Sequence, residues 1–343
     1  MYYGTVNPHG GDVSVVLDFS VSGNPLGTPP GVLTAAREAL KHADRYPDPS
    51  CRALVRAIAA YEGVQEDRIL CGNGSSELIY AFCAAVRPRR AVELAPTFSE
   101  YSAALAGHGC AVTRYVLRPE ADFSLDEGFL SFLEEERPEA VFLCTPNNPT
   151  GRLIAPTLLE RIVHFCAARR IRLFLDVCFL ELSDGGRATA FPNDDPGLFL
   201  LNAATKTWGM AGLRLGWCLS ADTALLKRMS ALTPPWNVSG PAQAAGVAAL
   251  GKQAYLREAK ALIRTERVFL TAELRCLGLW VCPSEANFLL FRGPLGLRDT
   301  LLAQGAAIRD CANFPGLGPG WYRIAVRRHE ENARLIALLR EVL

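Results

Sequence analysis

The stretch LNAATKTWGMAGLRLGWC, residues 201–218, contains the residue with the clearest chemical signal in this sequence, Lys206. An apolar run, GLFLLNAA, leads directly into Thr205 and Lys206, and Arg214 follows eight residues later. Burial at the end of such a strand lowers the pKa of a lysine, so that its neutral amine can attack a carbonyl carbon and form a Schiff base. Most lysines, however, bury only their alkyl stems and keep the charge in water. This segment alone leaves both interpretations open.

The composition argues against several classes of protein. The 343 residues include 36 basic and 35 acidic side chains, so no strong net charge attracts nucleic acid or a membrane surface. The eleven cysteines show no metal-ligand spacing and have mostly apolar neighbours, as buried thiols do in a reducing cytosol. The N-terminal sequence has no signal-peptide pattern, and no apolar run reaches the ~20 residues that span a bilayer. We therefore expect a soluble cytoplasmic protein with no metal site and no nucleic-acid or membrane partner.

The pattern between about residue 50 and residue 235 predicts an α/β fold. Short apolar segments alternate there with amphipathic ones, which favours a mainly parallel sheet with helices on both faces. A further helix over 31–42 is followed by the turn signal YPDPS. The predicted helices are 51–62, 75–86 and 156–169, and the predicted strands are 91–94, 140–144, 171–175, 198–201 and 214–218.

Turn-rich segments divide the chain into three parts. Residues 1–30 are rich in Gly, Pro, Asn and Ser and are expected to form an extended arm that joins the small domain. Residues 31–235 form the predicted large domain, which ends near PPWNVSGP at 234–241. Residues 236–343 contain a long helical stretch to about 277, two short strands (NFLLF and YRIAV) and a closing helix. We predict a smaller α+β domain there.

Two turns follow strand-like segments of the large domain. GNGSSE at 72–77 follows RILC and opens a helix, where free N–H groups and the helix dipole suit a phosphate. The competing interpretation is an ordinary helix cap, because Ser and Asn favour that position. CTPNNPTG at 144–151 follows AVFLC, and α/β folds bind ligands at such carboxyl ends, although a plain loop also explains these turn residues.

Asp176 closes a third strand, IRLFL. A carboxylate beside so much apolar sequence is costly to bury unless it meets a cation or a hydrogen-bond donor. The order of features along the chain is therefore a candidate phosphate site, an asparagine pair, a carboxylate and a lysine.

In this order, GNGSSE, NNPTG, LDVCF and TKTWGMAGLRLG resemble the motifs of fold-type I pyridoxal-phosphate enzymes. The resemblance runs from HGGD at 9–12 to RIAVRRHEEN at 323–332. It implies a pyridoxal 5′-phosphate cofactor bound to Lys206 as a Schiff base. Asp176 would pair with the ring nitrogen, Asn148 would hydrogen-bond the ring oxygen, and Phe98 would stack on the ring. The resemblance places the cofactor phosphate on Gly74, Ser75, Ser76, Thr205 and Arg214.

The same resemblance implies an assembly and a substrate contact. Tyr46, in RYPDP, matches a tyrosine that reaches the cofactor phosphate of the neighbouring subunit, which implies a homodimer with shared active sites. Arg323 matches the arginine that binds the substrate anion. Arg327 lies four residues further on, and two such positions on a strand face the same way, so both arginines are expected to meet the substrate. His9, in the arm, is expected to join them.

Two families within this fold compete. Both histidinol-phosphate aminotransferases and threonine-phosphate decarboxylases share the motifs above. The decarboxylases serve cobalamin synthesis. The blocks HGGD, DFSVSGNPLG at 18–27 and IRDCANFPGLGPGWYRIAVR at 308–327 resemble the decarboxylases more closely. Phe179 also stands where aminotransferases usually have a tyrosine. Two departures affect substrate choice, namely Val177-Cys178 after Asp176 and the altered arm sequence SVSGNPLG.

The resemblance therefore predicts decarboxylation of a small phosphorylated amino acid, L-threonine O-3-phosphate, to aminopropanol phosphate. The alternative is an aminotransferase that acts on histidinol phosphate or a related amine with 2-oxoglutarate. A non-catalytic sensor with this fold is a third hypothesis. Sensors of that kind carry an added DNA-binding module, and this chain has neither the extra length nor a basic face.

Overall fold

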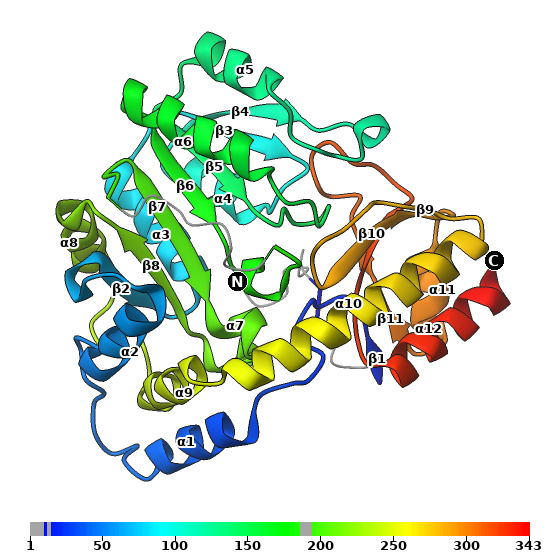
Figure 1. Cartoon of the computed structure of the whole chain (residues 1–343), viewed down its shortest axis with the longest axis horizontal. Coiled ribbons are helices and arrows are strands. Elements are labelled where there is room, and N and C mark those ends of the chain that lie inside the picture. The colour runs from blue at the N-terminus through cyan, green and yellow to red at the C-terminus, as the bar shows by residue number, and fades with distance from the viewer. Residues whose placement is uncertain (1–9, 12–14, 186–193) are drawn as a thin grey trace.

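The computed structural model describes residues 10–11, 15–185 and 194–343, which form a large and a small unit joined by one long helix (Figure 1). A sheet of seven strands, in the order β2-β8-β7-β6-β5-β3-β4, forms the centre of the large unit. β8 runs antiparallel to both of its neighbours, and the other neighbouring pairs are parallel. The predicted α/β class with a mainly parallel sheet is confirmed. The strands are β2 (Ile69–Gly72), β3 (Arg90–Ala95), β4 (Ala111–Val116), β5 (Ala140–Cys144), β6 (Arg172–Asp176), β7 (Leu198–Ala203) and β8 (Gly216–Ser220).

The central strands are apolar throughout because helices cover both faces of the sheet. On one face Phe142, Phe174 and Phe199 stack in a row, with ring centroids 4.8 and 5.0 Å apart. This face packs against α3 (Ser75–Val86), α4 (Glu100–Ala106) and α8 (Thr223–Leu232). The opposite face packs against α2 (Arg52–Glu62), α5 (Gly128–Glu136) and α6 (Pro156–Arg169).

The differences from the predicted elements have local causes. The predicted strand 214–218 begins only at Gly216, because Arg214 has a left-handed backbone with φ 58°. β4 was not predicted, since its residues AVTRYV are half-buried or exposed and do not form a continuous apolar run. The long helical stretch before residue 277 is two helices, α9 (Gly240–Leu250) and α10 (Gln253–Cys276), separated at Gly251.

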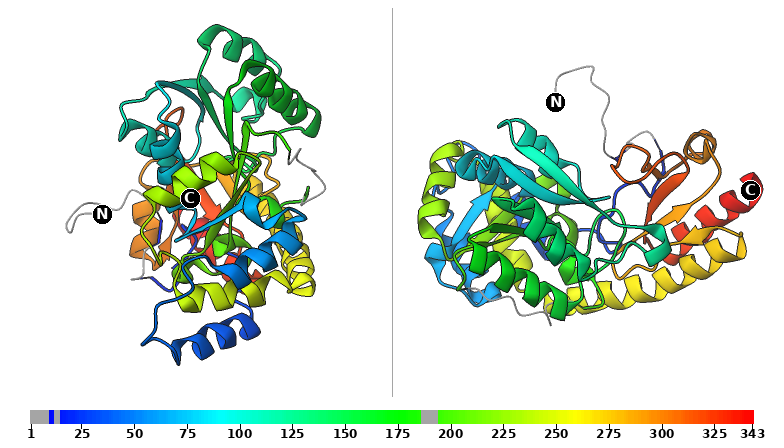
Figure 2. Two further views of the ribbon diagram at one scale, coloured as in Figure 1. Left: turned by 90° about the vertical axis from the view of Figure 1, so that its left-hand side faces the viewer. Right: turned by 90° about the horizontal axis from the view of Figure 1, so that it is seen from above.

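α10 connects the two units, and the small unit lies at the C-terminal end of this helix (Figure 2). Its antiparallel sheet has the order β12-β13-β10-β9 and packs against α10, α11 (Leu297–Ala303) and α12 (His329–Val342). The strands are β9 (Trp280–Val281), β10 (Phe288–Arg292), β12 (Arg309–Asp310) and β13 (Trp321–Ala325).

The N-terminal arm touches both units. β1 (Leu17–Asp18) pairs in parallel with β11 (Ala306–Ala307) of the small unit. Asn24 of the arm donates a hydrogen bond to the carbonyl of Thr207 in the large unit. The helix that follows the arm, α1 (Pro30–Leu40), packs on α9, which also contacts α2. The predicted domain limits at residues 30 and 235 stay a prediction. None of the described helices is long and apolar enough to cross a membrane.

Candidate active site

A cavity of about 300 Å³ lies at the carboxyl ends of β5 and β6, where ligands bind in open α/β sheets. Both units and the N-terminal arm contribute to its walls. The lining residues are Gly10, Ser20, Val21, Ser22, Ser75, Ser76, Phe98, Glu100, Tyr101, Cys144, Asn148, Asp176, Cys178, Phe179, Lys206, Arg309, Phe314 and Arg323. The cavity therefore brings together side chains that are far apart in the sequence.

Asp176 is the last residue of β6 and is buried. Tyr101 donates a hydrogen bond from its hydroxyl to Oδ2 of Asp176 at 2.7 Å, and the backbone N–H of Cys178 donates to Oδ1 at 2.9 Å. Burial raises the pKa of Asp176, whereas these donors and the charge of Lys206 act in the opposite direction. The carboxylate is thus prepared for a cationic partner in the cavity.

Lys206 lies in the short helix α7 (Ala204–Thr207), which begins where β7 ends. Its Nζ is 5.6 Å from the ring centroid of Phe179. Burial, followed by the positive charge of Arg323, lowers the pKa of Lys206 to about 8. A substantial fraction of this amine is neutral near physiological pH, as a nucleophile toward a carbonyl requires.

The N-terminal arm packs on the turn that carries Lys206. Asn24 donates from Nδ2 to the carbonyl of Thr207 at 2.8 Å, and Thr28 donates from Oγ1 to the carbonyl of Gly209 at 2.7 Å. Gly209 has φ +63°, and a Cβ there would lie 2.7 Å from the backbone of Gly27. The contact therefore requires glycine in the turn.

The start of α3 forms one end of the cavity. Gly74 is the N-cap residue with φ 80°, so Ser75 and Ser76 are the first two helical residues. No side-chain hydrogen bond from the N-cap residue caps this helix, and the phosphate site stays a prediction. A Cβ at Gly74 would lie 2.6 Å from Nη2 of Arg214. The missing side chain lets the arginine approach a helix N-terminus, and this combination suits a phosphate.

The two asparagines of NNPTG have different roles. Asn147 is buried and holds the turn together, since its Nδ2 donates to the carbonyl of Pro96 at 2.9 Å and its Oδ1 accepts from Thr97 at 2.8 Å. Asn148 lines the cavity, and its Oδ1 accepts a hydrogen bond from Nη1 of Arg323. With the oxygen engaged in this way, the amide nitrogen of Asn148 is the group that can donate to a ligand.

Arg323 is a buried residue of β13. Its Nη2 donates to the carbonyl of Ser20 at 3.0 Å, and its Nε has no partner within the described part of the chain. Burial lowers the pKa of Arg323 to about 10. A buried guanidinium with an unused N–H that borders a cavity is suited to bind an anion.

Several expected site residues are not at the cavity wall. Gly74, Thr205 and Arg214 are not lining residues in the described ranges, although Gly74 and Arg214 approach each other beside Ser75. Tyr46 is 79% exposed and stacks on Trp236, with ring centroids 4.5 Å apart. His9 lies outside the described residues.

Arg327 does not face the same way as Arg323 on a strand, because β13 ends at Ala325. Its guanidinium pairs with Glu331 at 2.7 Å and donates to the carbonyl of Asp18 at 2.9 Å. The strand argument for two convergent arginines is therefore wrong.

Sequence reasoning missed several lining residues, and two of them, Tyr101 and Arg309, carry polar groups beside predicted site residues. Tyr101 lies in APTFSEY, three residues after the predicted stacking residue Phe98, at the start of α4. Arg309 of β12 pairs in register with Arg323, and its Nη2 donates to Asn313 at 2.8 Å. Burial lowers the pKa of Arg309. Its only sequence signal was its place in the block IRDCANFPG, beside so many other arginines.

A family model for class I and II aminotransferases matches residues 14–339. The chain belongs to this family. The threonine-phosphate decarboxylase of Salmonella typhimurium is 38% identical over 334 residues, which cover 96% of this chain and 91% of the relative. A histidinol-phosphate aminotransferase from an Anaeromyxobacter species is 34% identical, with 96% and 92% covered. The solved histidinol-phosphate aminotransferase from Clostridium acetobutylicum is 28% identical, with a TM-score of 0.88 and 95% and 99% covered.

The protein is a pyridoxal-phosphate-dependent enzyme of this family. A similar structure, the histidinol-phosphate aminotransferase from Sinorhizobium meliloti, was solved with pyridoxal 5′-phosphate; it is 26% identical, with a TM-score of 0.84 and 96% and 92% covered. The residues of this cavity fit that cofactor. They include a lysine of lowered pKa, a buried carboxylate with its own donors, and a helix start that Arg214 can approach because Gly74 has no Cβ.

Proposed function

We propose that this enzyme decarboxylates a small phosphorylated amino acid, L-threonine O-3-phosphate, to aminopropanol phosphate and carbon dioxide in the cytoplasm. The observation that carries the proposal is the 38% identity to a threonine-phosphate decarboxylase across 96% of the chain. Phe179 supports it from the site, because the side chain beside Lys206 has no hydroxyl with which to hydrogen-bond the cofactor ring. The product is a building block of the cobalamin side chain, as the resemblance implies.

The cofactor would be held by the residues that the sequence pattern predicts. Nζ of Lys206 would bind its aldehyde carbon, Asp176 would pair with the ring nitrogen, and Nδ2 of Asn148 would donate to the ring oxygen. Phe98 would stack on the ring. When bound, pyridoxal phosphate supplies an electron sink for negative charge at the substrate Cα. The cofactor phosphate would be held by Gly74, Ser75, Ser76, Thr205 and Arg214.

Decarboxylation breaks the bond between Cα and the carboxyl carbon, and its electron pair stays on Cα as carbon dioxide leaves. A proton must then be delivered to Cα. The amine of Lys206 can hold and deliver this proton, since its pKa of about 8 is close to the operating pH. Phe98, Phe179 and Phe314 line the cavity and limit the access of water to Cα.

Arg323 and Arg309 would bind the substrate phosphate. They are paired on adjacent strands and both line the cavity. A firm clamp on the carboxylate that leaves as carbon dioxide would work against decarboxylation. Two guanidinium groups are therefore better used on the phosphate dianion. Arg327 would act on the substrate site through the N-terminal arm, because it donates to the carbonyl of Asp18. His9, which belongs to that arm, would contact the substrate.

We also propose a homodimer in which Tyr46 reaches the cofactor phosphate of the partner. Tyr46 is 79% exposed, and Trp236 holds its ring in place by stacking. A second cavity is lined by these two residues together with Leu40, which is itself 57% exposed. An exposed aromatic cluster of this kind suits an interface with a second copy of the chain.

The second candidate is an aminotransferase on histidinol phosphate. What supports it is a TM-score of 0.88 to an enzyme of that name and 34% identity to another. In this case the Cα–H bond breaks, its electron pair stays on Cα, and the amine of Lys206 carries the proton away from Cα.

The deciding experiment incubates the holoenzyme with threonine phosphate labelled with ¹³C in the carboxyl group and follows labelled carbon dioxide. A parallel reaction contains histidinol phosphate and 2-oxoglutarate, and glutamate is measured. Release of carbon dioxide without glutamate formation supports the decarboxylase. Glutamate formation without carbon dioxide release overturns it in favour of the aminotransferase.

A further inference from the structure

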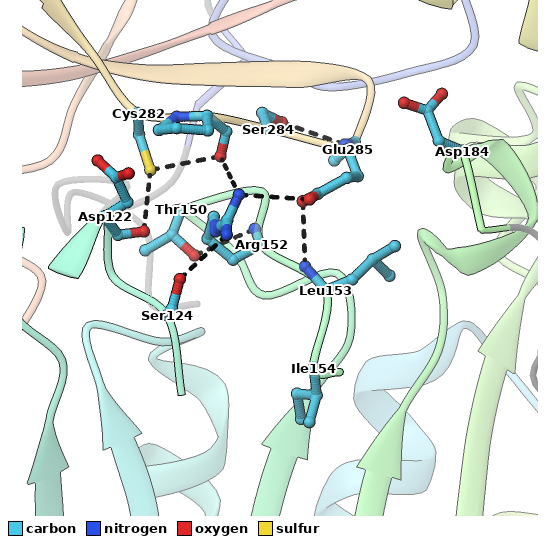
Figure 3. A network of polar contacts seen from close by, with 12 residues as sticks. Asp122, Ser124, Thr150, Arg152, Leu153, Ile154, Asp184, Cys282, Ser284 and Glu285 are labelled. Carbon is cyan, nitrogen blue, oxygen red and sulfur yellow. Dashed lines mark hydrogen bonds and ion pairs between the residues drawn. The ribbon is translucent and has the colours of Figure 1, made fainter. Parts of the chain in front are cut away.

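A loop of the small unit lies directly against the turn that carries Asn148 (Figure 3). The loop connects β9 and β10, and the backbone N–H of Glu285 donates to the carbonyl of Gly151 at 2.9 Å. A Cβ at Gly151 would lie 2.1 Å from Oγ of Ser284, and Gly151 has φ +74°. The two loops therefore meet backbone to backbone, at a position that requires glycine.

Arg152 extends this contact with its side chain. Nη1 donates to Oε1 of Glu285 at 3.3 Å and to the carbonyl of Pro283 at 3.4 Å, while Nη2 donates to Oγ of Ser124 at 3.0 Å (Figure 3). The second carboxylate oxygen of Glu285 accepts from the backbone N–H of Leu153 at 3.3 Å. The side chains of Arg152 and Glu285 are 23% and 30% exposed. The additional hydrogen-bond partners of each side chain and their partial burial distinguish this pair from an isolated surface ion pair.

The main chain of Arg152 closes the turn around Asn148. Asn147 donates from its N–H to the carbonyl of Arg152 at 2.8 Å, and the N–H of Gly151 donates to the carbonyl of Asn147 at 2.7 Å. A shift of Arg152 must therefore move Asn148, which lies inside this closed turn.

The loop on the other side leads to Arg323. Glu285 lies three residues before β10, and Leu290 of β10 pairs in register with Arg323 of β13. The contact between Arg152 and Glu285 thus joins the same two units as the hydrogen bond between Asn148 and Arg323. The backbone N–H of Asp184, five residues beyond Phe179, also donates to the carbonyl of Glu285 at 3.2 Å.

We propose that Arg152 and Glu285 are positioning residues that hold Asn148 in register with Arg323 across the two units. They would thereby set the hydrogen bond that Asn148 donates to the ring oxygen of the cofactor. This inference rests on the proposed role of Asn148 and not on the choice between decarboxylation and transamination. Neither residue lines the cavity within the described part of the chain, so both act through Asn148.

The test measures the pH midpoint of the visible absorbance change of the bound cofactor, without substrate. An N–H donor to the ring oxygen stabilises the negative charge on that oxygen, which lowers the pKa of the group whose protonation changes the absorbance. Loss of the donor therefore raises the pH midpoint. We expect Asn148→Ala to raise it by about 1 pH unit. Arg152→Met and Glu285→Gln should shift it in the same direction by a smaller amount. Arg152→Lys keeps the positive charge, so its midpoint should lie closer to that of the wild type than the midpoint of Arg152→Met does.

A double-mutant cycle separates positioning from a general loss of stability. If Arg152 acts through Asn148, adding Arg152→Met to Asn148→Ala should leave the midpoint of the single Asn148 variant unchanged. The matched control is Arg161→Met, which removes an exposed ion pair with Glu127 on the nearby helices α5 and α6 and should leave the midpoint unchanged. Thermal unfolding of each variant reports stability separately.

Two results would overturn the inference even if the proposed role of Asn148 holds. One is a midpoint in Arg152→Met and Glu285→Gln equal to that of the wild type while Asn148→Ala shifts it. The other is an additive shift in the double variant. If Asn148→Ala itself causes no shift, the proposed role of Asn148 fails and the inference fails with it. The carbon dioxide assay tests the reaction independently of all three outcomes.

Discussion

Arg323 donates a hydrogen bond from Nη1 to Oδ1 of Asn148, joining residues 175 positions apart at the boundary between the two units. This single contact orients both groups. It directs the amide oxygen of Asn148 toward the arginine and leaves the amide nitrogen to donate to a ligand, and it fixes the guanidinium at the cavity wall. The cavity wall is therefore complete only when the small unit is in place.

Lys206→Ala should remove the visible absorbance of the bound cofactor and abolish turnover, because the amine that binds the aldehyde carbon is lost. The measurements are the absorption spectrum of the purified protein and the initial rate with threonine phosphate. Lys227→Ala, an exposed lysine of α8, is the control and should behave as the wild type. A Lys206 variant with comparable turnover would disprove the assignment.

Asp176→Asn should still bind the cofactor but lose on the order of 4 kcal/mol of transition-state stabilisation, about a thousandfold in rate. The neutral amide cannot keep the ring nitrogen protonated. Tyr101→Phe removes one donor to the same carboxylate and should raise the pKa of Asp176, so the acid limb of the pH–rate profile should move to higher pH. Near-normal activity of Asp176→Asn would exclude the proposed role.

Arg309→Gln should raise the Michaelis constant for threonine phosphate about tenfold to a hundredfold, as expected when one charge-assisted hydrogen bond is lost. Arg327→Gln should have a smaller effect, since that guanidinium is paired with Glu331. Cofactor affinity should change little in either variant, and steady-state kinetics with a cofactor titration measure both quantities. A larger effect at Arg327 than at Arg309 would reverse our assignment of the phosphate site.

In the cofactor-free protein, Lys206→Met should raise the free energy of unfolding at neutral pH. The pKa of Lys206 falls from 10.5 to about 8 on folding, so the folded state binds fewer protons between these values. The wild type therefore carries a cost of up to about 3 kcal/mol below pH 8, which diminishes as the pH rises toward 10.5. Denaturant unfolding of both proteins at pH 7 and pH 10 should show the difference shrinking with pH. A constant difference would contradict a buried, pKa-shifted amine.

Mixing two inactive variants tests the shared active site. If each site takes Lys206 from one chain and Tyr46 from the other, a heterodimer of Lys206→Ala and Tyr46→Ala contains one intact site and one doubly altered site. Activity should reappear when the two variants are exchanged at micromolar concentration. Sedimentation should give a dimer for each protein. A monomeric protein, or the absence of recovery in a confirmed heterodimer, would count against the shared site.

The sequence by itself determined the elements of the large unit and the segments that carry the cofactor chemistry. β5 and α3 have the predicted limits, and the strand that ends at Asp176 and the turn at Lys206 lie where the pattern places them. These features are local. A continuous apolar run forms a strand buried on both faces. A polar residue directly after it lies at the carboxyl end of that strand, where the fold binds ligands.

Only the tertiary structure decided which distant residues complete the site. Tyr101 meets Asp176 because α4 packs on the same sheet face, and Arg309 lines the cavity because β12 pairs with β13. Arg327 was placed wrongly, since the sequence does not show that the strand ends at Ala325. The contact of Arg152 with Glu285 had no sequence signal. Tyr101 and Asp176 are 75 residues apart, and Arg152 and Glu285 are 133 residues apart. The geometry of such contacts depends on how helices, strands and the two units pack together rather than on any local periodicity.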